Sequence, residues 1–126
     1  MVAVENLVVA GTAGGEEGVR GFLAAYDQQT GKEVWKFYNT AAPGEPGGDT
    51  WGGLPTDKRI ASIWGLPGSY DVARRTIIWA TANPRPYPRM TRHNGNPDAI
   101  PRTSPAELYT NSTIALDPDT GKLKWY

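Results

Sequence analysis

One hairpin motif occurs twice in the chain, and this repeat restricts the folds that the chain can adopt. The pattern Ala-x-Asp-x-x-Thr-Gly-Lys-x-x-Trp occupies residues 25–35 and again residues 115–125. In each copy the Asp carboxylate can accept hydrogen bonds from the backbone N–H groups that follow it, and the Gly suits a turn position with positive φ. An isolated hairpin cannot bury the Trp that ends its returning strand. We therefore expect the two copies to lie in stacked units, with each Trp ring packed against a neighbouring unit.

Composition and patterning indicate an all-β chain that is rich in turns. Gly and Pro account for 15 and 11 of the 126 residues, beside five Trp and six Tyr, which is typical of an all-β fold and not of a disordered chain. No segment shows the 3.6-residue period of a helix. Short apolar or β-branched runs predict strands. The first three runs, at residues 6–11, 20–27 and 34–39, form a three-stranded meander. Two more strands are predicted at 59–65 and 69–83, around a turn at 71–75, and a closing strand–turn–strand unit at 112–126.

Two long connections interrupt the strands. Residues 40–58 are rich in Pro and Gly and cannot form regular structure throughout, and residues 84–107 form a long Pro-rich connection. A loop as long as 84–107 is unusual inside a compact domain unless it has a function.

Charge and composition exclude several functional classes. The 13 basic residues balance 13 acidic ones, which argues against nucleic acid or an anionic membrane as a partner. No apolar run approaches about 18 residues, so no membrane span is expected. Cysteine is absent, which excludes disulfides and thiolate zinc sites. Residues 1–15 lack the basic segment and cleavage site of a signal peptide, and we predict a strand there.

Three short stretches carry residues suited to ligand chemistry. Glu16 lies in a Gly-rich turn, Trp64 lies at a strand start before a Gly, and Asn83 precedes a Pro that ends a strand. Carboxylate and amide oxygens suit Ca²⁺, and an exposed indole face suits a planar cofactor. Taken one at a time, a solvated surface Glu, a core Trp and an ordinary turn Asn are the commoner interpretations. The single histidine, His93, is expected to face solvent.

The repeat resembles the tryptophan-docking motif of quinoprotein alcohol dehydrogenases, which are eight-bladed β-propellers that carry pyrroloquinoline quinone (PQQ). The resemblance implies an all-β segment of such a propeller, with antiparallel four-stranded blades. Blades recur about every 40–45 residues in propellers, so the wider spacing of the two motifs implies a blade enlarged by insertions. We expect the end of one blade at residues 1–39, a connecting loop at 40–58, and the next blade at 59–126 with a Pro-rich insertion at 84–107.

The resemblance also assigns roles to the candidate residues. Gly14, Gly15 and Glu16 match a segment of the family. That segment places glycines beside the cofactor and supplies a Glu that binds the metal. Trp64 matches the Trp that forms the floor under the quinone. Asn83 matches a metal-coordinating Asn in a Thr-Gly-Asn-Pro sequence. The resemblance therefore implies Gly14, Gly15 and Trp64 as cofactor-binding residues, and Glu16 and Asn83 as metal ligands.

This chain departs from the family pattern at several positions. Ala13 stands where a hydroxyl residue often contacts the cofactor, and Glu17 stands where an apolar residue is common. Ala82 replaces the Gly that precedes Asn-Pro in the family motif. An alanine at this position requires a negative φ. The stretch at residues 65–71 is one residue longer than the common pattern.

The function implied is oxidation of an alcohol to an aldehyde or ketone, with PQQ and Ca²⁺ or a lanthanide ion. The family's catalytic Asp and a quinone-contacting Arg come from later segments, so we expect no catalytic residue here, an inactive isolated chain, and the remaining blades of a longer polypeptide as partners. The resemblance further implies a cytochrome-type electron acceptor and a periplasmic location. The alternatives are a non-catalytic propeller scaffold with the same repeat and a stand-alone β-sandwich that binds sugar.

Overall fold

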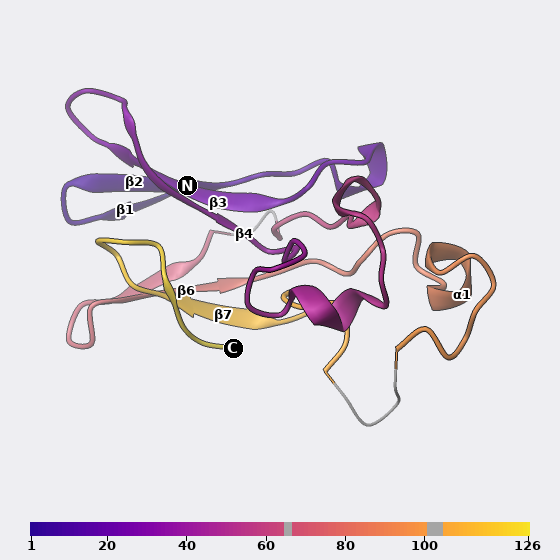
Figure 1. The fold of residues 1–126 in the computed structure, drawn as a ribbon. Coiled ribbons are helices and arrows are strands. Elements are labelled where there is room, and N and C mark those ends of the chain that lie inside the picture. The colour runs from indigo at the N-terminus through magenta and orange to yellow at the C-terminus, as the bar shows by residue number, and fades with distance from the viewer. Residues whose placement is uncertain (65–66, 101–104) are drawn as a thin grey trace.

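The computed structural model describes residues 1–64, 67–100 and 105–126, without the side chain of Glu16, and shows two four-stranded antiparallel sheets (Figure 1). Each sheet is a simple meander, with the strands paired in the order of the sequence. The first contains β1 (Val2–Val4), β2 (Leu7–Gly11), β3 (Phe22–Asp27) and β4 (Glu33–Tyr38). The second contains β5 (Ser69–Asp71), β6 (Thr76–Ala80), β7 (Thr113–Leu116) and β8 (Leu123–Trp125). The predicted all-β architecture with four-stranded antiparallel sheets is confirmed.

Short helical turns occupy the connections. They are the 3₁₀ helices η1 (Gly15–Glu17), η2 (Gly48–Trp51) and η3 (Thr56–Lys58), and the single-turn α-helix α1 (Arg89–Arg92). The absence of a helical period in the sequence is consistent with elements this short. Within the described residues, no helix has the length and apolar character needed to cross a membrane.

The two copies of the repeat form nearly identical hairpins. Asp27 Oδ1 accepts hydrogen bonds from the Thr30 backbone N–H and hydroxyl at 2.8 Å each, and these bonds lower the pKa of its carboxyl. Asp117 accepts the same pair from Thr120 at 3.1 and 3.0 Å. The strand register shifts at the same point of each copy, between Ala25 and Tyr26 and between Ala115 and Leu116. The sequence pattern thus encodes one local structure twice, as expected.

Trp35 joins the two sheets. Its indole Nε1 donates a hydrogen bond to the Pro118 carbonyl at 2.8 Å, and only 7 % of the residue is exposed. A Cβ built on Gly121 would lie 2.5 Å from the indole ring, so the ring rests on the backbone of the second hairpin turn. Only a glycine allows this approach, because φ at Gly121 is +66° and any side chain there would meet the ring.

The second copy of the motif has no such partner within the described residues. Trp125, which corresponds to Trp35, is 49 % exposed. Gly31, which corresponds to Gly121, has open space where a Cβ would stand. The described residues therefore form one complete docking contact, and they leave the Trp125 ring and the Gly31 turn each without a docking partner.

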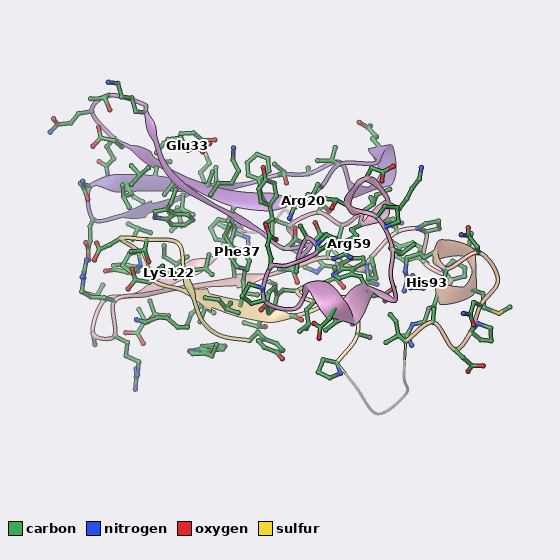
Figure 2. All side chains as sticks on the ribbon, viewed as in Figure 1. Arg20, Glu33, Phe37, Arg59, His93 and Lys122 are labelled. Atoms are coloured by element: carbon green, nitrogen blue, oxygen red, sulfur yellow. The ribbon has the colours of Figure 1, made fainter. Side chains whose placement is uncertain are left out.

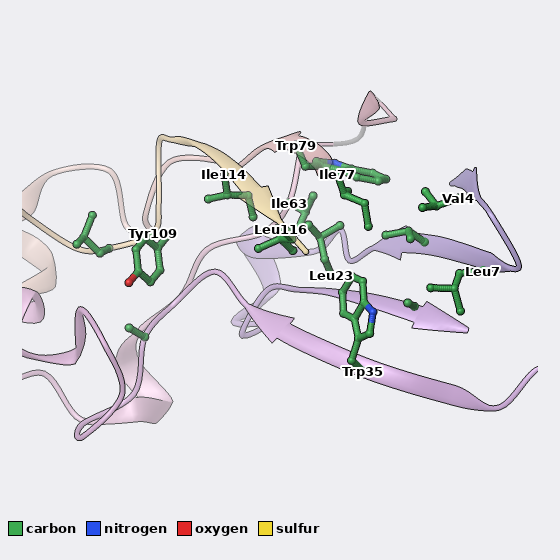
Figure 3. Close-up of a cluster of buried hydrophobic side chains, with 14 residues drawn as sticks. Val4, Leu7, Leu23, Trp35, Ile63, Ile77, Trp79, Tyr109, Ile114 and Leu116 are labelled. Carbon is green, nitrogen blue, oxygen red and sulfur yellow. The ribbon is translucent and has the colours of Figure 1, made fainter. Parts of the chain in front are cut away.

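The core lies between the facing sheets, around the docked indole (Figure 3). Apolar side chains from both sheets and from the segment between them meet there, and burial of such side chains is the main favourable term in folding. The cluster includes Val4, Leu7, Val9, Leu23, Ala25, Trp35, Ile63, Ile77, Trp79, Ile114 and Leu116.

The structure differs from the predicted strands in two places. The first sheet has a fourth strand, β1, beyond the expected three-stranded meander, because a tight turn at Glu5 (φ 55°) pairs Val2–Val4 with β2. Residues 59–64 do not form a regular strand. Ile60 and Ile63 form isolated antiparallel bridges with Arg85 and Thr81, and Ala61 forms an isolated parallel bridge with Arg20. Residue 65 of that predicted strand lies outside the described residues.

An ion-pair network joins the turn ends of the two sheets. Arg75 donates to Glu5 Oε2 at 2.8 Å and to Asp119 Oδ1 at 2.9 Å, and Tyr70 donates its hydroxyl to Glu5. These contacts connect the β1–β2 turn with the β5–β6 and β7–β8 turns. The hydrogen bond from Arg75, with that from Tyr70, lowers the pKa of Glu5 from 4.5 to about 2.

We predict that Gly121→Ala destabilises residues 1–126 more than Gly31→Ala. Both positions have nearly the same positive φ, +66° and +69°, so the backbone penalty cancels in the comparison. Only the methyl group at position 121 meets the Trp35 ring, and overpacking of this kind costs about 1–3 kcal/mol. Urea unfolding of the two variants measures the difference, and equal free energies of unfolding would contradict the docking contact.

We also predict that the Glu5 network makes stability depend on pH. Because the pKa of Glu5 is lower in the folded chain, its contribution is fully present above pH 4.5 and is lost as the pH falls toward 2. The free-energy difference between wild type and Glu5→Gln should therefore shrink over that interval in urea titrations. A difference that stays constant from pH 6 to about pH 2.5 would show that Glu5 is not paired.

Candidate functional site

Three of the predicted site residues line one pocket. Gly14, Trp64 and Asn83 come from three separate segments of the chain and surround a hollow of about 170 Å³. Gly14 belongs to the connection between β2 and β3 of the first sheet, whereas Trp64 precedes β5 and Asn83 follows β6 of the second. The other lining residues are Ala13, Ser62, Ile63, Ala82, Arg85 and Tyr87.

The Gly-rich turn on the first sheet packs directly against the segment at residues 59–64. Gly14 caps η1 with φ 88°, and the Glu17 N–H donates to the Gly14 carbonyl at 3.0 Å. A Cβ on Gly15 would lie 3.0 Å from the backbone nitrogen of Ser62, so a larger residue would push the turn away. Gly15 lines an adjoining hollow of about 550 Å³ that Arg85 and Tyr87 also line. The backbone of Glu16 lies in η1, and its side chain lies outside the described part of the structure.

Trp64 stands at the surface of this pocket and not in the core. Ile63 is 3 % exposed and Trp64 is 54 % exposed, as expected for adjacent side chains of an extended segment, which point to opposite sides. The Ile63 N–H donates to Thr12 O at 3.0 Å, and the Trp64 N–H donates to Ala80 O at 3.3 Å. The segment is thus fixed to both units while the indole stays open to a ligand.

Asn83 lies between two residues whose backbones are hydrogen-bonded, and its own side chain is free. Ala82 donates to Ser62 O at 3.0 Å and accepts from the Asn111 N–H at 2.9 Å, and the Arg85 N–H donates to Ile60 O at 2.9 Å. Ala82 is not among the residues with positive φ, so the local backbone accommodates Ala in place of Gly. The Asn83 amide is exposed and makes no side-chain hydrogen bond to another described residue. An ordinary structural turn Asn would use its side chain locally.

The donor chemistry at this site fits a hard cation and a flat ring. The amide oxygen of Asn83 is of the kind that Ca²⁺ takes as a ligand, and the open indole of Trp64 offers a flat apolar face. Among the side chains that the structure describes, no three His, Cys, Asp or Glu groups gather closely enough to hold a metal ion.

The Pro-rich connection contributes residues that the sequence reasoning did not select. The Arg85 guanidinium lies 3.7 Å from the centre of the Tyr87 ring, and both residues line the pocket. A second, polar hollow of about 400 Å³ lies beside the first and shares Asn83 and Tyr87 with it. The alternation Pro84-x-Pro86-x-Pro88 was the available signal, because it forces an extended backbone next to Asn83.

His93 corrects a prediction. It was expected to face solvent, but its side chain is 2 % exposed, and Nε2 lies 3.1 Å from Glu107 Oε1 (Figure 2 labels His93 beside the small helix α1). A buried carboxylate accounts for the difference, because it offers the imidazole a partner inside the loop. A lone His in a Pro-rich loop carries no sequence pattern that reveals such a partner.

Comparison with known proteins identifies the family. The family model described as "PQQ: Glucose/ethanol/alcohol dehydrogenase, beta-propeller domain" matches residues 1–126. The chain belongs to this family. The predicted resemblance to quinoprotein alcohol dehydrogenases is confirmed, and the two sheets of Figure 1 are of the four-stranded kind that forms propeller blades.

Several relatives of this propeller family match nearly the whole chain. Quinohemoprotein alcohol dehydrogenase ADH IIB of Pseudomonas putida is 34% identical over 98% of this chain and 18% of the relative. The lanthanide-dependent methanol dehydrogenase of Methylacidiphilum fumariolicum is 29% identical over 98% of this chain and 21% of the relative. The crystal structure of quinohemoprotein alcohol dehydrogenase from Comamonas testosteroni superposes with a TM-score of 0.74 and 30% identity, over 96% of this chain and 18% of that one. The chain thus spans about a fifth of the length of these relatives.

We predict that removing the Asn83 side chain leaves stability almost unchanged. Asn83→Ala should alter the free energy of unfolding by less than about 0.5 kcal/mol, as is usual for an exposed side chain without partners. Asn39 provides the matched control, because it is fully buried and donates to Ser62 O at 3.1 Å. Asn39→Ala should cost about 1–3 kcal/mol. A large loss at Asn83 in urea unfolding would show a structural role instead.

Proposed function

We propose that this chain is a segment of a quinoprotein dehydrogenase that oxidises an alcohol to an aldehyde or ketone with PQQ and a bound Ca²⁺ or lanthanide ion. The observation that carries the proposal is the convergence of the Gly14 turn, the open Trp64 indole and the free Asn83 amide on one pocket. The family to which the chain belongs supports the same chemistry. A relative named for its lanthanide dependence and a solved europium-containing methanol dehydrogenase support the choice of metals.

The residues of this chain bind and orient in this proposal. Trp64 provides a rigid aromatic floor for the planar cofactor, and Asn83 Oδ1 with the Glu16 carboxylate holds the metal. The glycines at positions 14 and 15 keep the turn free of side chains, so that its backbone stays close to the pocket. Bound PQQ would supply the hydride-accepting chemistry that no side chain possesses.

Other parts of a longer polypeptide complete the site in this proposal. The remaining blades supply the base that accepts the hydroxyl proton and cover the exposed Trp125 and Gly31. The isolated segment is then inactive. In this proposal a cytochrome-type protein receives the electrons, and the enzyme works in the periplasm. The name of a relative, methanol dehydrogenase [cytochrome c] subunit 1 of Methylorubrum extorquens, supports the choice of acceptor. A non-catalytic scaffold would need neither an open indole nor an unused amide beside the same hollow.

We predict that Trp64→Ala and Asn83→Ala impair different steps of cofactor loading in the complete polypeptide. Loss of the aromatic floor should weaken PQQ binding about tenfold, since aromatic stacking contributes about 0.5–1.5 kcal/mol beyond its buried area. Loss of the Asn83 oxygen, a direct metal ligand in this proposal, should weaken Ca²⁺ binding strongly. The loss should exceed the roughly 10–100-fold that is typical when a residue hydrogen-bonded to a metal ligand is removed. Isothermal titration and dye-linked oxidation of ethanol measure the two effects.

The control is Val72→Ala, which removes an exposed apolar side chain at the opposite end of β6. It should bind PQQ and Ca²⁺ like the parent protein. If the Trp64 and Asn83 variants also bound both ligands like the parent, the proposed site would be wrong.

A further inference from the structure

A buried charge cluster lies next to the candidate site and has no role in the proposal above. Arg92 forms a bidentate pair with Glu107, with Nε at 2.6 Å from Oε1 and Nη2 at 2.5 Å from Oε2. The two side chains are 5 % and 4 % exposed, and His93 contacts the same carboxylate. Arg89 approaches it at 3.9 Å from the partly exposed side. Ion pairs buried to this degree are weak evidence of a stabilising role, because desolvation offsets much of their attraction.

The third nitrogen of the Arg92 guanidinium holds the segment that follows Asn83. Nη1 donates to the Pro86 and Tyr87 carbonyls at 2.6 Å each. The prolines at positions 84, 86 and 88 remove backbone N–H groups from this segment. Pro86 and Pro88 have no N–H to donate, so the carbonyls of Pro86 and Tyr87 are the main groups by which this part of the segment can be held. An arginine can donate to two carbonyls and a carboxylate at once.

The Glu107 end of the pair is fixed to the connection between the sheets. The Glu107 N–H donates to Thr50 O at 2.8 Å, and the Leu108 N–H donates to Thr50 Oγ1 at 2.9 Å. The indole of Trp51, which is fully buried, donates to Leu108 O at 2.6 Å. The carboxylate thus stands on a rigid support, and Arg92 transmits that support to Pro86 and Tyr87.

Among the described residues, hydrogen bonds between backbone groups hold the segment only as far as Arg85. The Arg85 N–H donates to Ile60 O, and beyond it the described contacts of the Pro86 and Tyr87 carbonyls are those with Arg92. Tyr87 lines both hollows beside Asn83. The position of this wall, and with it the space next to the Asn83 amide, therefore depends on the Arg92–Glu107 pair.

We propose that Arg92 and Glu107 are positioning residues of the metal and cofactor site, and that they hold the segment from Asn83 to Tyr87 against the pocket without touching a ligand. This inference rests on the proposed function, because it assigns the pair to the site that Asn83 and Trp64 form.

The test separates positioning from stability in the complete polypeptide. Arg92→Met leaves the buried Glu107 carboxylate without its bidentate partner and should lower both the melting temperature and ligand affinity. The double variant Arg92→Met/Glu107→Leu removes both charges, which restores stability in many proteins, but it does not restore the donors to Pro86 and Tyr87. We expect its melting temperature to recover while the Ca²⁺ concentration needed for half-maximal PQQ binding stays about tenfold higher, as for loss of an outer partner.

PQQ binding is measured by the quenching of tryptophan fluorescence. The measurement is made at a temperature at which circular dichroism shows that every variant is folded. Arg92→Lys keeps the charge and should recover stability with only partial recovery of affinity, because an ammonium lacks the fork that reaches both carbonyls. Leu7→Ala is the matched control: it lies in the core away from the pocket, and it should lower the melting temperature without changing the Ca²⁺ requirement.

The outcomes distinguish this inference from the function on which it rests. A double variant that regains both stability and the parent Ca²⁺ requirement would show that the pair is merely structural. A Leu7→Ala variant whose Ca²⁺ requirement rises with its loss of stability would lead to the same conclusion. A parent protein that binds neither PQQ nor Ca²⁺ would overturn both proposals together.

Discussion

The contact between the Trp35 indole and the turn at Pro118 and Gly121 determines how the two sheets lie. It combines one hydrogen bond at 2.8 Å with a close approach of ring to backbone that only glycine permits. The apolar faces of the sheets can associate in many orientations, since hydrophobic attraction has no direction. A directed hydrogen bond and a ring seated on a glycine select one of them, so the repeated motif is a device for orientation as well as for burial.

The candidate site follows from that orientation. The Gly14 turn connects two strands of the first sheet, Asn83 follows β6 of the second sheet, and Trp64 lies in the segment that bridges the two sheets, so the pocket exists only where these parts meet. The segment at residues 59–64 ties them there, through bridges to Arg20 on one side and to Arg85 and Thr81 on the other. The Pro-rich connection adds the outer wall, which the Arg92–Glu107 pair fixes in place. The same docking that stacks two sheets thus also assembles a site from both.

Much of this arrangement could be predicted from the sequence, because repeats and turns carry strong local signals. The two motifs predicted the hairpins and the role of Trp35, and the resemblance to quinoprotein dehydrogenases selected Gly14, Trp64 and Asn83. The structure brings these three together, while their roles as ligands stay predictions. Three features escaped sequence reasoning for physical reasons. Strand β1 depends on a turn in which Glu5 takes a positive φ, which is uncommon for a residue of this type. Residues 59–64 pair with both sheets and so belong to neither. The Arg92–Glu107 pair joins two points of a loop without any periodic pattern.

The most direct test of the docking contact is a comparison of the proton NMR signals of Gly121 and Gly31, which occupy the same position in the two copies of the motif. The hydrogen of Gly121 that takes the place of a Cβ points at the Trp35 ring, with three ring atoms within about 3.0 Å of that Cβ position, and Gly31 has open space there. The account predicts an upfield ring-current shift of one Gly121 Hα, with nuclear Overhauser contacts to the indole, and neither effect at Gly31. Two glycines with the same chemical shifts and no contact to Trp35 would contradict the account.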